Sequence, residues 1–214
     1  MKMNFKVTAV AKVYAESKCE NLDEKRLVPK MMLRRRLTRS AKMMIYLSDQ
    51  CHFSDGPVVY GSAYGEMQAT ADIVGAIAST QPISPTAFQN SVYNTAPSYF
   101  SLLYGNKNEI LTISSGSDTS ANVLQSAALQ AVTMNTEVLL VCTEALNIPN
   151  INEVNSCTDY LEAGVALSIT PTDVLPNITV IKNEHKGFSP SLWAMLDVVN
   201  ACETKADPVI ALEL

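Results

Sequence analysis

A serine lies at the turn between an apolar stretch and a helical pattern, in the sequence "LTISSGSDTSANV" at residues 111–123. Gly116 favours a tight turn, and the backbone N–H groups of a helix N-terminus stabilise negative charge on a group held there. Such a turn could present Ser117 as a nucleophile. Ser and Asp are also common helix caps, and capping by Ser117 and Asp118 is the simpler interpretation.

The sequence offers few other groups for catalysis. A serine nucleophile needs a base, and the two histidines are His52 and His185. The five cysteines form no CxxC pair and no metal-ligand spacing: Cys19, Cys51, Cys142, Cys157 and Cys202. We interpret them as structural thiols of a reducing compartment. We predict no metal site and no cofactor.

Positive charge gathers in one short part of an acidic chain. The net charge is −5, yet eight of the sixteen basic residues lie between Lys25 and Lys42. A basic face there suits an acidic partner, and its arginines are Arg34, Arg35, Arg36 and Arg39. A solvated helix face without a partner is the alternative. No aromatic residues alternate with these arginines, so the pattern does not favour nucleic acid.

Length and composition predict one cytoplasmic domain over residues 1–214. The chain is 47% hydrophobic and 17% charged, which allows a good core. No apolar run approaches the roughly 18–20 residues of a membrane-spanning helix. Lys12 interrupts the apolar N-terminal stretch, whose alternation favours a strand over a signal peptide.

Strand and helix patterns alternate along the chain, which predicts an α/β fold. Apolar runs predict strands at the N-terminus and at residues 58–60, 108–114, 136–144, 161–170, 177–183 and 208–214. Helical spacing predicts helices at residues 30–51, 66–80, 119–134 and 189–202. The first of these helices would carry the basic face.

Six blocks in order carry a resemblance to a known family: "MMLRRRLTRSAKMM", "VVYGSAYGEMQAT", "ISPTAFQNSVYNTAPSYFSLLYG", "ILTISSGSDTSANVLQSA", "EVLLVCTE" and "EAGVALSI". Over residues 28–170 the chain resembles the N-terminal half of β-ketoacyl synthases. It is most similar to the short synthase-like proteins and chain-length factors encoded beside aryl polyene and flexirubin-type pigment genes. The resemblance implies a thiolase-like half, with a layered five-stranded mixed sheet and helices on both faces. Residues 171–214 would form a C-terminal extension.

The resemblance also implies a change at the nucleophile. In active synthases the turn after this strand carries the Cys that accepts the acyl chain, and counting from Gly105 or back from Val138 places Ser117 there. The two catalytic His of such enzymes come from a C-terminal half, and the chain ends before that half could be built. The implied function is a non-catalytic, chain-length-factor-like subunit in fatty acid, polyketide or aryl polyene type biosynthesis. The alternatives are an acyltransferase or thioesterase using Ser117, and a binding module unrelated to acyl chemistry.

Partners follow from the same resemblance. The family dimerises through segments that correspond here to residues 84–94 and 110–114, so an active synthase or a second copy is expected. The candidate contacts are Phe88, Val92, Tyr93, Asn94, Ile110 and Thr112, although core packing also explains the first three. Acyl carrier protein, which is acidic, would dock on the four arginines. The small-residue helix at 121–131 would need cover from the C-terminal segment or another chain, which predicts an obligate oligomer.

Overall fold

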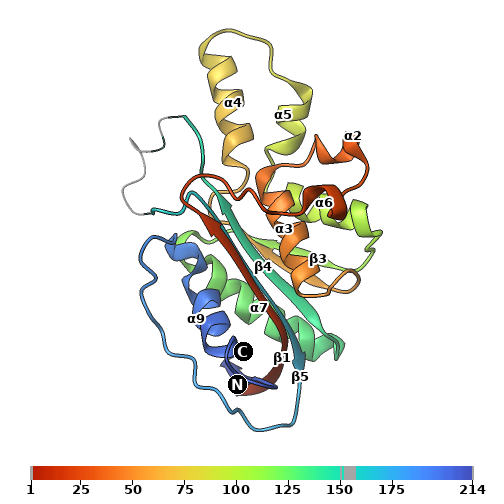
Figure 1. Ribbon diagram of the computed structural model, residues 1–214, viewed down its shortest axis with the longest axis vertical. Coiled ribbons are helices and arrows are strands. Elements are labelled where there is room, and N and C mark those ends of the chain that lie inside the picture. The colour runs from red at the N-terminus through yellow and green to blue at the C-terminus, as the bar shows by residue number, and fades with distance from the viewer. Residues whose placement is uncertain (1, 150, 152–157, 214) are drawn as a thin grey trace.

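A mixed sheet of six strands forms the centre of the computed structural model, which describes residues 2–149, 151 and 158–213 (Figure 1). The strands are β1 (Lys2–Ala15), β2 (Val58–Gly61), β3 (Ile110–Ile113), β4 (Val138–Ala145), β5 (Glu162–Pro171) and β6 (Val209–Glu213). Their order across the sheet is β3-β2-β4-β5-β1-β6. β2 pairs in parallel with β3 and β4, whereas β5 and β6 pair with their neighbours in antiparallel fashion.

Helices connect the strands and cover both faces of the sheet. They are α1 (Glu24–Leu27), α2 (Met31–Arg34), α3 (Arg39–Gln50), α4 (Met67–Ala78), α5 (Pro85–Asn90), α6 (Thr95–Tyr104), α7 (Thr119–Met134) and α9 (Trp193–Cys202). Two short 3₁₀ helices are η1 (Gly116–Asp118) and η2 (Pro190–Leu192). Within the described part of the chain, no helix combines the length and the apolar character needed to cross a bilayer.

The α/β architecture with helices on both faces is confirmed, but the sheet has six strands where the resemblance implies five. The additional strand is β6, which pairs with the first residues of β1, so that Lys2 lies opposite Glu213. Residues 177–183 are irregular, and the prediction of a strand there is wrong. The N–H groups of Asn177 and Ile178 both donate to the carbonyl of Val209 in β6, and β6 already occupies the edge of β1.

The core lies in two layers, one on each face of the sheet. Along β4 the side chains alternate: Val138, Leu140 and Cys142 pack with α7 and α9. Leu139 and Val141 pack on the other face with α3 and α6. Every residue of β4 is buried. A strand covered on both faces has a continuous apolar sequence, which is why this strand was predictable.

The basic segment at residues 30–51 forms two helices, and the prediction of one continuous helix is wrong. The hydroxyl of Thr38 accepts the N–H of Ala41 at 3.2 Å and caps the start of α3. Because Thr is a favoured N-cap, the second helix begins after it. Arg35 and Arg36 therefore lie in the turn that separates α2 from α3.

Small residues allow α7 to approach the sheet closely. Ala127, Ala128 and Ala131 of α7 are buried against it. At Gly61 of β2, a Cβ atom would lie 2.6 Å from a methyl carbon of Val123 in α7 and 2.7 Å from Cys142 Sγ. The close contact between α7 and β2 therefore requires glycine at position 61.

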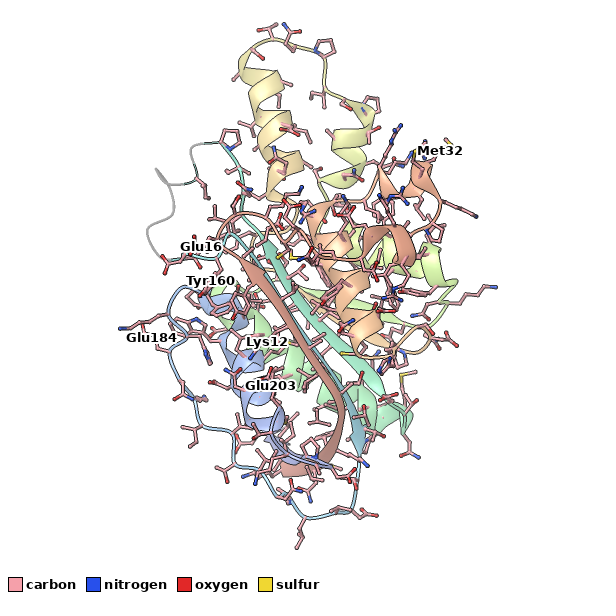
Figure 2. All side chains as sticks on the ribbon, viewed as in Figure 1. Lys12, Glu16, Met32, Tyr160, Glu184 and Glu203 are labelled. Atoms are coloured by element: carbon pink, nitrogen blue, oxygen red, sulfur yellow. The ribbon has the colours of Figure 1, made fainter. Side chains whose placement is uncertain are left out.

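The C-terminal residues cover the other side of α7. Met195, Leu196 and Val199 of α9 are buried in the same cluster as the apolar side chains of α7. Lys12 of β1 lies across from the end of α9, with its Nζ 2.9 Å from the Glu203 carboxylate (Figure 2). Because the C-terminal segment supplies the cover that α7 was expected to need, an exposed α7 face no longer supports an obligate oligomer.

Two helices project from the rest of the molecule (Figure 1). α4 and α5 lie against each other, and residues 67–90 are named the helical arm. Ala69 is the buried residue of α4, whereas large apolar side chains of the helical arm are exposed: Val74, Ile77, Ile83 and Phe88. Exposed apolar side chains on a projecting element indicate a contact surface.

Candidate functional site

Three parallel strands end at the same edge of the sheet and bring their following residues together. β2 is followed by Ser62, and β3 leads into the turn that carries Ser117. β4 has Glu144 next to its last residue. Parallel strands place their carboxyl ends on one side, where α/β proteins commonly hold functional groups. η1 also contacts η2 at this edge, so the C-terminal segment contributes to it.

Ser117 lies on η1, directly before α7, and its side chain is exposed. Gly116 before it has φ +56°, a conformation that favours glycine. The hydroxyl of Thr119 accepts the N–H of Ser115 at 3.0 Å and donates to the carbonyl of Gly116 at 2.8 Å. Thr119 thus stabilises the turn. Asp118 is the N-cap residue of α7, but no side-chain hydrogen bond caps η1 or α7. The capping prediction therefore holds for the position of Asp118 and is wrong for the side-chain bond.

The hydroxyl of Ser117 makes no hydrogen bond to a base in the described part of the chain. His185 Nε2 lies 2.8 Å from Asp197 Oδ1, and His52 is exposed beyond the end of α3. Neither histidine makes a described hydrogen bond to Ser117. An alcohol is a much weaker acid than a thiol and needs a base to become a nucleophile. The turn therefore presents an accessible alcohol without an evident means of deprotonating it.

Glu144 is a buried carboxylate that joins three segments at this edge. It accepts hydrogen bonds from Ser62 Oγ at 2.9 Å, from the Ala63 N–H at 2.7 Å and from Ser191 Oγ at 2.6 Å. Burial raises the pKa of Glu144, and these donors oppose the rise. The side chain is 1% exposed. It holds the loop after β2 to η2, which contacts the turn that carries Ser117. Its role was not predictable from the local sequence pattern.

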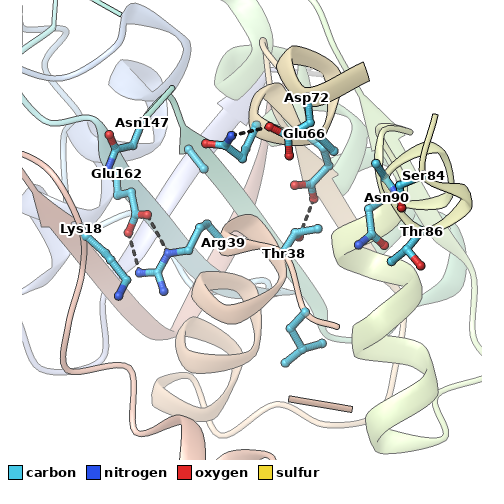
Figure 3. A pocket seen from close by; sticks show the side chains of 15 residues that line it. Lys18, Thr38, Arg39, Glu66, Asp72, Ser84, Thr86, Asn90, Asn147 and Glu162 are labelled. Carbon is cyan, nitrogen blue, oxygen red and sulfur yellow. Dashed lines mark hydrogen bonds and ion pairs between the residues drawn. The ribbon is translucent and has the colours of Figure 1, made fainter. Parts of the chain in front are cut away.

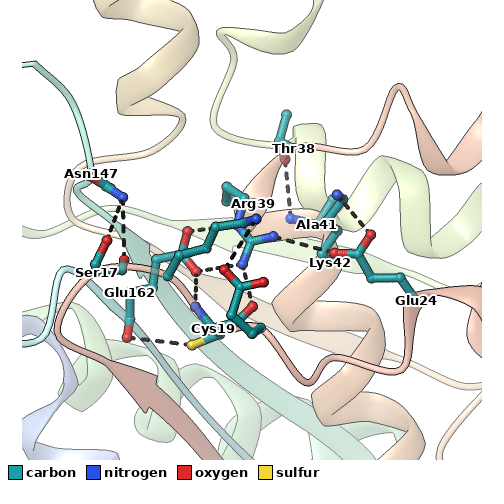
Figure 4. A network of polar contacts seen from close by, with 11 residues as sticks. Ser17, Cys19, Glu24, Thr38, Arg39, Ala41, Lys42, Asn147 and Glu162 are labelled. Carbon is teal, nitrogen blue, oxygen red and sulfur yellow. Dashed lines mark hydrogen bonds and ion pairs between the residues drawn. The ribbon is translucent and has the colours of Figure 1, made fainter.

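Arg39 is half-buried and contacts a second buried carboxylate (Figure 3 and Figure 4). Its Nε and Nη2 lie 2.6 Å and 2.7 Å from the two carboxylate oxygens of Glu162, which is 1% exposed. Arg39 Nη2 also donates to the carbonyl of Cys19 at 2.7 Å, and Glu24 lies 3.4 Å from Nη1. The prediction of four free guanidinium groups therefore needs correction at Arg39, because this side chain compensates a buried charge.

The other three arginines differ in access. Arg34 is half-buried, and its Nη1 donates to the carbonyl of Val28 at 2.7 Å. Arg35 and Arg36 are exposed and have no described side-chain partner. Of the four arginines predicted to bind an acidic partner, Arg35 and Arg36 at the turn between α2 and α3 are therefore the exposed ones.

The predicted partner residues lie on α5, in the turn before α6 and on the edge strand β3. Phe88, Val92 and Tyr93 are 67%, 47% and 44% exposed, so core packing does not explain them. A groove of about 350 Å³ joins Asn94 to Ile110 and Thr112 of β3. The structure therefore brings Asn94 to the edge of β3.

The described residues contain no group of three or more His, Cys, Asp or Glu side chains placed to hold a metal ion. Cys19, Cys51, Cys142 and Cys202 are buried and free. Burial raises the pKa of the Cys19 and Cys202 thiols to about 11 and that of Cys51 to about 12. Cys157 lies outside the described residues. No residue set in the described part can be assigned to a cofactor.

Several solved structures share this fold. One chain of the complex of the ketosynthase ApeO with its chain length factor ApeC from Xenorhabdus doucetiae is 18% identical, with a TM-score of 0.70 and 97% of each chain covered. The ishigamide ketosynthase/chain length factor is 11% identical, with a TM-score of 0.58, and the match covers 83% of this chain and 63% of that one. A β-ketoacyl synthase from Burkholderia phymatum STM815 is 14% identical, with a TM-score of 0.58. The match covers 81% of this chain and 60% of that one. At these identities the likeness shows the thiolase-like fold of the synthases.

The sequence itself matches a family model described as β-ketoacyl synthase, N-terminal domain, over residues 11–205. The chain therefore belongs to this family, which confirms the resemblance of the six blocks. No curated protein sequence matches it. The chain spans about three fifths of the length of the second and third structures described above.

Proposed function

We propose that this chain is a non-catalytic, synthase-like subunit that assembles with an active β-ketoacyl synthase and assists acyl chain elongation in fatty acid, polyketide or aryl polyene type biosynthesis. The observation that carries the proposal is the alcohol of Ser117 at the nucleophile turn, exposed and without a described base. Condensation requires a nucleophile that accepts the acyl chain, and an unassisted alcohol is poorly suited to this step. The similar structure of a ketosynthase with its chain length factor supports such a pairing.

The proposed partner surface is the free edge of β3 together with the exposed residues before α6. β3 is an edge strand of the described sheet, so the backbone groups on its outer side pair with no other strand of that sheet. A partner can extend the sheet at such an edge, and apolar side chains beside it add buried area. The residues proposed to contact the partner are Phe88, Val92, Tyr93, Asn94, Ile110 and Thr112.

Light scattering tests this assembly at micromolar concentration. We expect a homodimer of the isolated chain, or a heterodimer when an active β-ketoacyl synthase is added. Phe88→Asp should weaken the complex because it buries a charge at the contact. Leu175→Asp is the control, since Leu175 is 79% exposed on the segment after β5. A stable monomer that also fails to bind the synthase would contradict the proposal.

Docking of acyl carrier protein is proposed for Arg35 and Arg36. Such proteins are acidic, and exposed positive charges chiefly accelerate and orient association with them. Replacing both by Gln should slow association several-fold and remove most of its dependence on salt. Replacing Lys107, an exposed cation in the turn before β3, should leave the association rate unchanged. Stopped-flow fluorescence with a labelled carrier protein measures this rate.

Acyl transfer or thioester hydrolysis by Ser117 is the enzymatic alternative, and mass spectrometry of the intact chain decides it. After exposure to acyl thioesters, our proposal predicts no adduct at Ser117. An adduct that disappears in Ser117→Ala would replace the proposal. A chain that binds neither a synthase nor a carrier protein would favour a binding module unrelated to acyl chemistry.

A further inference from the structure

A groove of about 560 Å³ lies beside the start of α6. Arg36 lines it from the turn between α2 and α3, and Thr95 from the first residue of α6. Thr86 and Asn90 line it from α5, where they lie next to each other (Figure 3). The groove therefore includes one of the two exposed arginines of the basic turn and the N-terminal end of a helix.

The described lining of the groove carries one positive charge and no negative one. Arg36 is exposed, and its guanidinium forms no described hydrogen bond or ion pair, while no Asp or Glu lines the groove. Burial raises the pKa of Tyr99 in the groove, Arg36 opposes this rise, and Glu66 adds to it to a smaller extent. Glu66 lies outside the lining and accepts a hydrogen bond from Thr38. The charge of Arg36 is therefore the stronger of the two at the groove.

Thr95 provides a second, independent sign that the groove takes an acceptor. It is 4% exposed, and its Oγ1 makes no hydrogen bond to any described residue. A buried hydroxyl without a partner costs free energy, and a bound acceptor removes that cost. No side chain caps the start of α6, so the positive end of the helix dipole adds to the attraction for an anion.

The remaining lining fits a short acidic side chain. The amides of Gln89 and Asn94 line the groove without a described hydrogen bond, and each can donate to an oxygen. Leu33 and Leu102 provide apolar surface for a hydrocarbon stem. A guanidinium binds a carboxylate through two parallel hydrogen bonds, so one arginine suffices for one carboxylate.

We propose that this groove receives the carboxylate of an Asp or Glu side chain of the docked acyl carrier protein, with Arg36 and the hydroxyl of Thr95 as its donors. The proposal rests on the carrier-protein docking proposed above. It is favoured by charge complementarity, since carrier proteins are acidic and Arg35 extends the positive surface beyond the groove. Val92 and Asn94 belong both to the groove and to the proposed synthase surface, so the carrier protein would dock where the two subunits meet.

Two single substitutions separate the groove from the general effect of charge. In stopped-flow experiments with labelled carrier protein, Arg36→Gln should raise the dissociation rate at least about tenfold, because a hydrogen-bonded charge pair is lost. Arg35→Gln is the matched control, since Arg35 is equally exposed on the same turn and does not line the groove. It should slow association and leave dissociation unchanged. Equal dissociation rates of the two variants would overturn the groove while leaving carrier-protein docking in place.

Thr95→Val gives an independent readout because it keeps the shape of the side chain and removes the hydroxyl. The hydroxyl has no partner in the free protein, so urea denaturation should show no loss of stability. Dissociation of the carrier protein should nevertheless become about threefold to tenfold faster. An unchanged dissociation rate would contradict the proposal. Circular dichroism checks the fold, and Arg36→Gln, at an exposed position, keeps the test decisive if Thr95→Val does not fold.

A small probe tests the groove without the carrier protein. We expect Nα-acetyl-glutamate methylamide to shift the backbone NMR signals of Asn94 and Thr95, and its neutral glutamine analogue to leave them unchanged. The shifts should disappear in Arg36→Gln. Absent shifts, or equal shifts with the glutamine analogue, would reject the site. Shifts with the glutamate probe in a chain that binds no carrier protein would reject the carrier protein as the source, together with the docking proposed above.

Discussion

Ser117 differs from the four described thiols in its access to solvent, and chemical labelling can measure this difference. A Ser117→Cys substitution would place an exposed thiol at a helix N-terminus, which lowers a thiol pKa. In a Cys157→Ser background, we expect one fast-reacting thiol per chain with iodoacetamide at pH 7.5. The buried thiols should react slowly, because burial raises their pKa values. Intact-mass spectrometry counts the adducts.

The control for this labelling is Ser120→Cys, because Ser120 is buried one turn further along. Its thiol should react as slowly as the native ones. Slow labelling at position 117 would mean that the turn is covered. The proposed function would then lose the observation that carries it, which is the exposure of the Ser117 hydroxyl.

Arg39 and Arg36 are close in sequence, but removing their side chains should have very different effects. Arg39→Ala leaves Glu162 buried without its cation, which costs about 3–5 kcal/mol of unfolding free energy. Arg36→Ala removes an exposed charge and should cost less than about 0.5 kcal/mol. Urea denaturation measures both values. Equal, small losses would show that the Arg39–Glu162 contact does not hold α3 to β5.

Glu66 should make stability depend on pH. Its pKa is about 7 in the folded protein and near 4.5 in an exposed glutamate, so the folded state binds more protons between these values. Relative to Glu66→Gln, the free energy of unfolding should therefore fall by about 3 kcal/mol as the pH rises from 4.5 to 7. Thermal or urea unfolding at several pH values measures the difference. A constant difference would show that Glu66 ionises normally.

Single residues of the site were predictable only where the family pattern or an apolar side chain marks them. Ser117 was found through its position between Gly105 and Val138. Glu144 and Glu162 were missed because each lies at one end of an apolar strand, where a charged residue indicates only a boundary. Their partners Ser191 and Arg39 lie 47 and 123 residues away in sequence. No local spacing connects such pairs.

At the scale of elements, strands with cover on both faces were the most predictable. Helices pack on both faces of β4, so all of its side chains are buried. Its sequence is therefore a continuous apolar run, which made the strand predictable. The alternation at residues 177–183 misled the prediction, since Ile178 and Val180 pack on the core while their backbone lies outside the ladders. The break between α2 and α3 depends on the cap at Thr38. The spacing of apolar residues does not predict such a cap.

Two glycine substitutions test how closely α7 packs on the sheet. Gly61→Ala should cost about 1–3 kcal/mol, because its Cβ would overlap Val123 and Cys142. Gly75→Ala is the matched control, since a Cβ there meets nothing within 4 Å and alanine favours the exposed helix α4. It should raise stability by about 0.5–1 kcal/mol. Chemical denaturation measures whether each substitution lowers or raises the free energy of unfolding. A Gly61→Ala variant as stable as the wild type would contradict the close packing.

At the scale of the whole molecule, the C-terminal segment gives this synthase-like half its own cover. α9 buries the outer side of α7, and β6 extends the sheet beyond β1. What stays exposed is the edge of β3, the residues before α6 and the helical arm. We propose that a synthase partner covers these exposed surfaces, and that this molecule contributes surface while the partner supplies the chemistry.

The most direct test of the non-catalytic role is condensation by an active partner synthase in the presence of wild-type chain or Ser117→Ala. The reaction uses acyl and malonyl carrier proteins, and mass spectrometry follows the products. We predict that the isolated chain makes no product, that adding it raises the activity or changes the chain length made by the synthase, and that Ser117→Ala does so equally well. Loss of this effect in Ser117→Ala, or condensation by the isolated chain, would contradict the account.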